Sequence, residues 1–185
     1  MSASTTEQGT VTTWQLDPSH TQVEFSAKHM MFTTVKGRFG SIKGTIRLDE
    51  QDISRSSVVA EIEAASLDTR TEQRDTHLRS QDFLHVEQHP LITFKSTRVE
   101  RAGEDRFKVA GDLTIRGTTR EVVLDTTLTG RGKTPFGTTV AGFEASTSIN
   151  RKDFGLNWNV ALEAGGFLVG DTIKITIDAE AVLEA

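Results

Sequence analysis

The sequence contains no cysteine, and this absence excludes disulfides, thiolate nucleophiles and cysteine-based metal sites. Long hydrophobic runs are also missing, since no apolar stretch approaches the ~20 residues of a membrane-spanning helix. Positive charge is scarce: 21 lysines and arginines stand against 26 acidic residues, and the basic residues form no sustained cluster. Nucleic-acid binding is therefore disfavoured, because neutralising phosphates requires a basic face. What remains is the composition of a soluble globular protein of one domain.

The N-terminal residues 1–12 are small and polar, and we expect them to form a disordered tail ahead of a single domain at 13–183. They contain neither the basic segment nor the apolar segment of a secretory signal peptide. The sequence therefore predicts a cytoplasmic protein.

Alternation of apolar and polar residues dominates the rest of the chain and predicts β-strands. The clearest example lies near the C-terminus, where Ile173, Ile175 and Ile177 alternate with polar and charged residues. Short glycine-containing turns separate several such runs, which indicates an antiparallel meander. Seven or eight strands in one domain favour an up-and-down barrel, because closure removes exposed edges, and a β-sandwich is the alternative. The expected strands lie near 22–30, 44–50, 57–64, 92–96, 107–115, 121–128, 139–149 and 171–179.

The strand faces expected to point inward combine large and very small side chains. An eight-stranded barrel is just wide enough to be filled by side chains or to hold one small ligand. This mixture would leave room for a ligand, but it would equally suit a barrel whose core simply tapers. The inward set includes Phe25, Phe39, Phe94 and Phe143 together with Ala27, Gly37, Gly111 and Ala141.

The segment 69–83 has the one clear helical pattern, and Thr69 with Glu72 forms a candidate capping box at its start. The helix is too polar for the core, so we expect it to lie across the sheet or over an open end. Its charged side chains form either a solvated face or a polar rim able to meet a phosphate or carbonyl headgroup. This group consists of Arg70, Arg74, Asp75, His77 and Arg79.

Two histidines four residues apart, His85 and His89, raise the question of a metal site. A zinc-binding helix of the metalloprotease type has glutamate directly after the first histidine, whereas Glu87 is two residues after it. Pro90 also disfavours helical geometry at His89. We therefore expect no metal site. His29 falls on the apolar face of its strand, which favours an interior histidine over a ligand or a base.

Several segments together resemble the YceI-like family of polyisoprenoid-binding, lipocalin-like proteins. They begin with "WQLDPSHTQVEFSAKHM" at 14–30 and include "RTEQRDTHLRSQDFLHVEQHPLITFKS" at 70–96, with further matches at 35–46, 111–124, 149–158 and 169–180. The resemblance runs in order through nearly all of 13–183. It implies an all-β fold, an eight-stranded antiparallel lipocalin-like barrel with a short capping helix and a deep apolar channel. It also implies a non-catalytic carrier for a long isoprenoid lipid, such as a polyprenyl phosphate or a quinone tail, with no cofactor.

We expect the channel to be lined by inward strand faces and by aromatic residues of segments that could close one end. The expected lining is Phe25, Ala27, His29, Phe39, Ile46, Ile62, Phe83, Phe94, Leu113, Ala141, Phe143, Phe154 and Trp158, and the expected headgroup rim is Arg70, Arg74, Asp75, His77 and Arg151. Two alternatives stay open. One is an enzyme acting on such a lipid with His29 or His77 as base, and the other is a filled barrel serving as an interaction module, for example as a homodimer.

Overall fold

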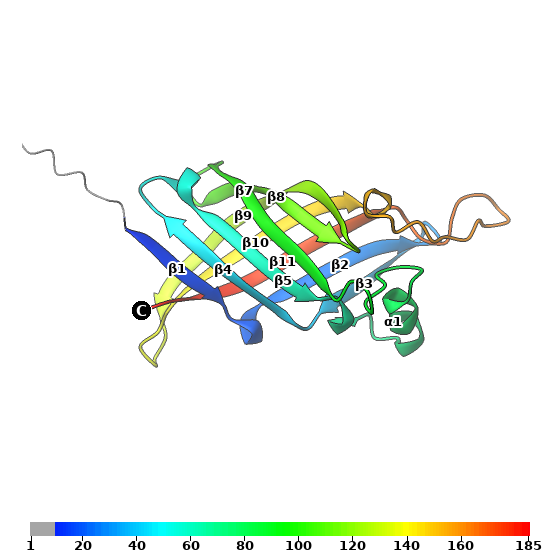
Figure 1. Ribbon diagram of the computed structural model, residues 1–185, viewed down its shortest axis with the longest axis horizontal. Helices are drawn as coiled ribbons and strands as arrows, with labels where there is room; N and C mark the ends of the chain where they lie inside the picture. The colour runs from blue at the N-terminus through cyan, green and yellow to red at the C-terminus, as the bar shows by residue number, and fades with distance from the viewer. Residues whose placement is uncertain (1–9) are drawn as a thin grey trace, which may run out of the picture.

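The computed structural model describes residues 10–185 and shows a closed barrel of antiparallel strands with one α-helix at one end (Figure 1). Most of the tail expected at 1–12 lies outside the described residues. The first strand already begins at Val11, which pairs with Asp49, so the ordered domain starts two residues before the predicted boundary. No helix among the described residues is long and apolar enough to cross a membrane.

Eleven strands, one α-helix and four short 3-10 helices make up the described chain. The strands are β1 (Val11–Leu16), β2 (Gln22–His29), β3 (Thr33–Phe39), β4 (Ile42–Asp49), β5 (Ser57–Glu63), β6 (Leu67–Asp68), β7 (Leu91–Arg101), β8 (Arg106–Ile115), β9 (Thr118–Lys133), β10 (Thr139–Asn150) and β11 (Thr172–Leu183). The helices are η1 (Pro18–His20), η2 (Ile53–Arg55), η3 (Ala64–Ser66), α1 (Glu72–Arg79) and η4 (Arg151–Phe154).

Eight of these strands close the barrel in the order β1-β4-β5-β7-β8-β9-β10-β11, and β11 pairs back onto β1. Closure runs through the antiparallel register of Trp14 with Leu183 and of Leu16 with Ala181. Every other neighbouring pair is antiparallel as well. The predicted eight-stranded antiparallel barrel is confirmed, and the sandwich alternative is wrong.

The remaining strands extend one end of the barrel. Both β1 and β2 pair antiparallel with β11, β1 at Ala181–Leu183 and β2 at Lys174–Asp178, so together they form one long strand with a kink. The kink is η1, where the Asp17 carboxylate accepts a hydrogen bond of 2.9 Å from the Ser19 amide. In the same way β3 continues into β4 and β5 into β6. The expected strands included β2, β4 and β5 but not β1, β3 or β6, and the kinks that join them were not predicted.

The predicted turns between the long strands are confirmed. Gly117 has φ 73° in the turn between β8 and β9, and Gly137 has φ 85° in the turn between β9 and β10. Both values lie in the left-handed region that glycine adopts without a steric penalty. The hairpin turns therefore sit where the glycine pattern placed them.

The helix is shorter than the predicted 69–83, because Thr69 does not cap it. Instead, the Thr69 amide and hydroxyl both donate to the Asp75 carboxylate, at 2.9 and 2.5 Å, and Arg70 has φ 65°. The N-cap is Thr71, whose side chain makes no capping hydrogen bond, so the predicted capping box is wrong. Figure 1 places α1 at the end of the barrel away from the C-terminus.

Candidate functional site

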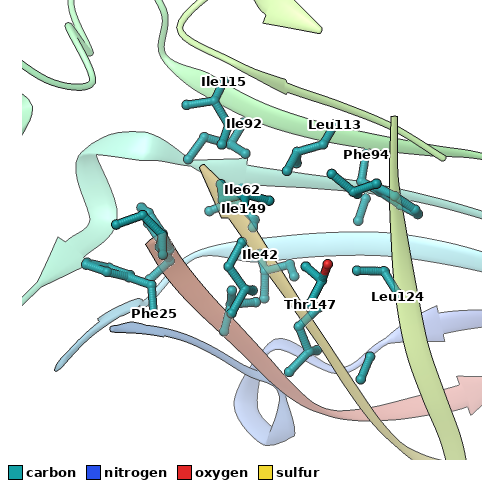
Figure 2. A pocket seen from close by; sticks show the side chains of 18 of the residues that line it. Phe25, Ile42, Ile62, Ile92, Phe94, Leu113, Ile115, Leu124, Thr147 and Ile149 are labelled. Atoms are coloured by element: carbon teal, nitrogen blue, oxygen red, sulfur yellow. The ribbon is translucent and has the colours of Figure 1, made fainter. Parts of the chain in front are cut away.

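The interior of the barrel is hollow and encloses a cavity of about 500 Å³. Side chains from every strand and from α1 line it, and nearly all of them are apolar. Figure 2 shows inward-pointing side chains from several strands around this space, among them Phe94 and Leu113 of the neighbouring strands β7 and β8. These two residues face each other across the β7–β8 ladder and are each 9% exposed.

Glycines in the wall explain how large rings and an open centre coexist. A Cβ atom on Gly37 would lie 2.4 Å from the Phe25 ring, and one on Gly111 would lie 2.5 Å from the Phe94 ring. Each phenyl ring therefore lies against the backbone of the next strand, in space that any other residue would occupy. Because each ring lies over a glycine of the neighbouring strand, it takes up less space at the centre of the barrel. The large and small residues together therefore surround a cavity and do not form a filled core.

One end of the barrel is sealed by a compact cluster around Trp14, which we call the plugged end. Trp14, Ala141 and Ala181 are 3%, 1% and 0% exposed and pack as one cluster, with partly buried leucines and Phe143 around it. The Trp14 indole N–H donates to the Thr12 hydroxyl at 2.9 Å. The Arg131 guanidinium lies 5.6 Å from the indole centroid and pairs with Glu50. The Arg131 guanidinium therefore covers the Trp14 ring of this cluster.

The opposite end, which we call the loop end, is covered by irregular segments instead of strand residues. Three rings from α1, from the turn after it and from the 155–171 segment meet there: His77, Phe83 and Trp158. The His77 centroid is 5.0 Å from Phe83 and 4.6 Å from Trp158, both edge-on, and Phe83 is 5.4 Å from Trp158. All three line the cavity, and His77 Nε2 lies 2.9 Å from an Asp82 carboxylate oxygen.

The wall is incomplete between β9 and β10 near the loop end. Their ladder stops at Ser146–Asp125, and beyond it β9 pairs only with β8 and β10 only with β11 within the described chain. The 3-10 helix η4 contacts both strands there, and its Phe154 is 1% exposed. Phe154 belongs to the main buried core cluster and is not among the residues that line the cavity.

Arginine side chains fasten the segments at the loop end to the barrel. Arg79 donates to the carbonyls of Ala65 and Leu67, and Arg116 donates to the carbonyl of Phe83 at 3.0 Å. These bonds run to main-chain acceptors, so they hold the backbone of each covering segment in place.

Buried Arg151, 2% exposed, makes the densest of these attachments. Its Nε donates to the Gly170 carbonyl at 3.0 Å, and Nη1 donates to the carbonyls of Leu156 and Trp158 at 2.6 and 2.9 Å. Nη2 lies 3.6 Å from the Asp171 carboxylate. Burial lowers the pKa of the Arg151 guanidinium, and the charge of Asp171 opposes this shift.

Comparison with known proteins shows to which family this barrel belongs. The family model described as the YceI-like domain matches residues 14–181. The chain belongs to the YceI-like family. A UPF0312 protein of Staphylococcus epidermidis is 37% identical over 171 residues, which cover 92% of this chain and 97% of that protein.

Two solved structures share the YceI-like fold of this chain. BcnA of Burkholderia cenocepacia matches with a TM-score of 0.78 at 21% identity, over 89% of this chain and 98% of that one. A polyisoprenoid binding domain from Saccharophagus degradans, implicated in plant cell wall breakdown, matches with a TM-score of 0.66 at 13% identity, over 91% and 97% of the two chains. At these identities the likeness concerns the fold alone.

Eleven of the residues expected to line the channel do face the cavity of this YceI-like barrel. They are Phe25, Ala27, His29, Phe39, Ile46, Ile62, Phe83, Phe94, Leu113, Phe143 and Trp158. Ala141 does not, because it is packed in the cluster around Trp14, and Phe154 does not, because it is buried in the main core cluster.

The expected headgroup rim is only partly at the cavity. Arg74 and His77 line it, whereas Arg70 and Asp75 do not. The Asp75 carboxylate accepts hydrogen bonds from the Thr69 amide and hydroxyl. Arg74 donates to the Thr69 hydroxyl and carbonyl, both at 2.7 Å. Arg151 touches the cavity, but its five N–H groups already have main-chain or carboxylate partners, so it is a fastening residue and not a free headgroup donor.

Lining residues of two kinds were not predicted from the sequence. Val58 and Ile92 share the alternation of the predicted lining residues Ile62 and Phe94, and Ile175 lies in the clearest alternating run, so the signal was present. Leu84 and Leu168 lie in irregular segments, where no periodicity shows which way a side chain points.

Among residues 10–185, the group of three side chains that could hold a metal lies away from the cavity lining. His85 and His89 lie in a turn region, with ring centroids 5.9 Å apart, and His85 has φ 50°, so they do not form a helical ligand pair. Asp17, His20 and Glu180 bring one potential ligand atom each within 4.8 Å of one another at the kink between β1 and β2. The hydrogen bonds from His20 and Ser19 lower the pKa of Asp17 to about 2, and the Asp17 carboxylate raises the pKa of His20.

Proposed function

We propose that this protein binds a long isoprenoid lipid, such as a polyprenyl phosphate, a quinone tail or a similar amphiphile, and releases it chemically unchanged. The observation that carries the proposal is the apolar cavity of about 500 Å³ where a barrel of this size would otherwise pack its core. Its volume lies within the range of about 300–1,000 Å³ that is typical of ligand sites.

The chemistry of the lining favours an apolar chain with any charge kept at the loop end. Apart from the hydroxyls of Ser56, Ser57, Thr126 and Thr147, the polar groups of the lining lie toward the loop end, among them Lys28, Arg74 and His77. An ionised group deep in the cavity would lose its hydration without gaining a partner, which is costly. We therefore place the lipid tail toward the plug and the headgroup toward α1.

Burial of the tail supplies the binding free energy. Each buried methylene contributes about 0.8 kcal/mol, so a five-carbon prenyl unit contributes roughly 3–4 kcal/mol before the entropy of ordering the chain is subtracted. Because this contribution depends on area and not on geometry, we expect loose selectivity for chain length. The Saccharophagus degradans domain that shares the fold is named for polyisoprenoid binding, which is consistent with this ligand class.

A carrier also accounts for the two histidines better than an enzyme does. His77 has its Nε2 engaged by Asp82 and both ring neighbours are aromatic, so it is built into the end of the cavity. His29 is tied to the 155–171 segment through its bridge to Val169. For His77 these contacts account for the side chain without a reacting group, whereas the bridge of His29 involves its backbone alone.

Native mass spectrometry of protein purified without detergent tests the proposal. We expect a bound lipid whose masses differ by whole isoprene units, and reloading of the delipidated protein by a prenylated quinone. A protein that carries no lipid and takes up no quinone from detergent micelles would overturn the proposal.

A further inference from the structure

Exposed apolar side chains are concentrated at the loop end. Five large apolar residues, Met30, Met31, Phe32, Val160 and Phe167, are between 37% and 78% exposed and belong to two neighbouring loops; we call them the apolar tip. The other exposed large apolar residues of the described chain are spread singly over other elements, as is common on soluble proteins. Phe136, in the turn between β9 and β10, is 92% exposed and lies at the plugged end.

The two loops of the tip are built as one ordered unit. The Met30 amide donates to the Leu168 carbonyl at 2.8 Å, and the Gly170 amide donates to the Lys28 carbonyl at 2.9 Å. The second loop is itself a small hairpin, in which the Asn159 side chain bonds both the amide and the carbonyl of Val169. In Figure 1 it projects beyond the barrel at the end away from the C-terminus.

The backbone of the first loop is held in a costly conformation. Met30 and Met31 have φ values of 50° and 65°, in the left-handed region where residues other than glycine are uncommon. A turn that needed only to reverse the chain would be more stable with glycine or asparagine there. Two exposed methionines in such positions suggest that the apolar side chains themselves are required.

The tip is continuous with the wall of the cavity. His29, immediately before Met30, and Leu168, immediately after Phe167, both line the cavity. A molecule leaving the cavity between α1 and the two loops would therefore pass directly beside the tip. The surface that holds the tip is thus also the edge of the cavity.

We propose that the apolar tip inserts into the surface of a phospholipid bilayer and positions the end of the cavity for lipid exchange. This inference rests on the proposed function, because it supplies the route by which an insoluble lipid enters. Aromatic and methionine side chains enter the boundary between headgroups and acyl chains, and binding grows with the apolar area inserted.

The charges around the tip fit a bilayer. Lys152 lies with its ammonium group 6.0 Å from the Phe167 ring centroid and also pairs with Asp171 at 3.4 Å, and Lys28 lies at the base of the first loop. Lysines set behind an apolar insertion can extend to lipid phosphates. Glu163 is the one carboxylate within the projecting hairpin, so the tip itself is nearly free of charge.

A second copy of the chain fits the tip less well than a bilayer does. A stable protein interface buries about 800 Å² on each partner. Even a fully buried aromatic side chain contributes only about 150–250 Å², and the tip has two phenylalanines. A convex projection of this size is too small for a dimer interface but suited to penetrating a soft surface.

Flotation with phosphatidylcholine vesicles tests docking without any lipid cargo. We expect the wild-type protein to float with the vesicles and the double variant Phe32→Ser with Phe167→Ser to float at least tenfold less. The matched control is Phe136→Ser, which makes the same chemical change at the other end and should float like the wild type. A wild type that stays in solution, or a tip variant that floats equally well, would overturn the inference, as would a dimer in sedimentation that the tip variant abolishes.

Uptake measurements separate this inference from the proposed function. Both proteins are offered a prenylated quinone in detergent micelles and in phosphatidylcholine vesicles. We expect the tip variant to load normally from micelles and at least tenfold more slowly from vesicles. If the wild type does not load from micelles, that result counts against the proposed function, and flotation still tests docking independently. If the wild type and the tip variant load equally fast from vesicles, the tip has no role in exchange.

Discussion

The two tryptophans of the chain lie at opposite ends of the barrel and have opposite surroundings. Trp14 is in a strand, is 3% exposed and packs against other strand residues. Trp158 is in an irregular segment, is half-buried and faces the cavity. One end is therefore sealed by the sheet itself, and the other by segments that arginine side chains fasten to it. Under the proposed function, the packed Trp14 cluster leaves the loop end as the end at which a lipid would enter and leave.

Truncating each tryptophan should give the largest contrast. We expect Trp14→Ala to lower the free energy of unfolding by about 3–5 kcal/mol, because it removes a large side chain from a packed cluster. Trp158→Ala should cost less than half as much, since its ring borders open space, but should change quinone uptake. Urea unfolding of the delipidated proteins measures the first effect and loading from micelles the second. Equal costs at the two ends would contradict the distinction.

Removing the fastening at Arg151 should have the next largest effect. We expect Arg151→Met to cost about 3 kcal/mol in urea unfolding, because the substitution leaves the buried carbonyl of Leu156 and the partly buried carbonyls of Trp158 and Gly170 without this donor. Arg120→Ala is the control, since Arg120 is exposed and bonds only the carbonyl of its neighbour Thr119. If both variants lose less than about 1 kcal/mol, a surface-like value, Arg151 does not hold the loop end.

Two alanine substitutions compare the plug with the cavity wall. Ala141→Phe should destabilise the protein by about 1–3 kcal/mol, because it overpacks the cluster around Trp14. Ala27→Phe adds its ring to the cavity, so we expect little loss of stability and a loss of quinone uptake. Melting of the delipidated variants and loading from micelles are the measurements. An Ala27→Phe protein that loads normally would show that the ligand does not occupy that part of the cavity.

The smallest expected effect is a pH dependence at the kink between β1 and β2. The pKa of Asp17 is about 2, so its contribution to stability is present above the ordinary carboxyl pKa and is lost as pH falls from there toward 2. The raised pKa of His20 contributes below the ordinary histidine value and is lost as pH rises through the folded-state value. NMR titration of the His20 ring should show a lower pKa in Asp17→Asn than in the wild type. An unchanged His20 titration would mean that the pair does not interact in solution.

Alternation along the strands favoured a barrel over a sandwich and predicted most of the lining, because it reports which face of a sheet a residue occupies. It does not report how far along the barrel axis the residue lies. Ala141 and Phe143 share one face of β10, yet Phe143 reaches the cavity and Ala141 lies wholly in the plug. Position along the axis depends on the stagger between strands, which is a non-local property.

The charged residues of the site were predicted less accurately from the sequence than the apolar lining. Arg151 and Asp75 were predicted to meet a headgroup because ionised side chains usually face solvent. Both are instead buried and satisfied by neighbouring groups, Arg151 by carbonyls of an irregular segment and Asp75 by Thr69. Such partners become adjacent only when the irregular segments fold back, so no local pattern in the sequence could have indicated them.

The ladder between β9 and β10 is hydrogen-bonded over only part of its length, and this bears on how wide the barrel can become. Hydrogen bonds fix the distance between neighbouring strands at about 4.8 Å wherever a ladder is complete. At the loop-end half of this seam, only the packing of η4 sets that distance. Widening the circumference there would therefore not require breaking any β9–β10 ladder bond. If the protein binds a lipid as proposed, this section of the wall is where the barrel would adapt to tails of different thickness, while the complete ladders stay closed.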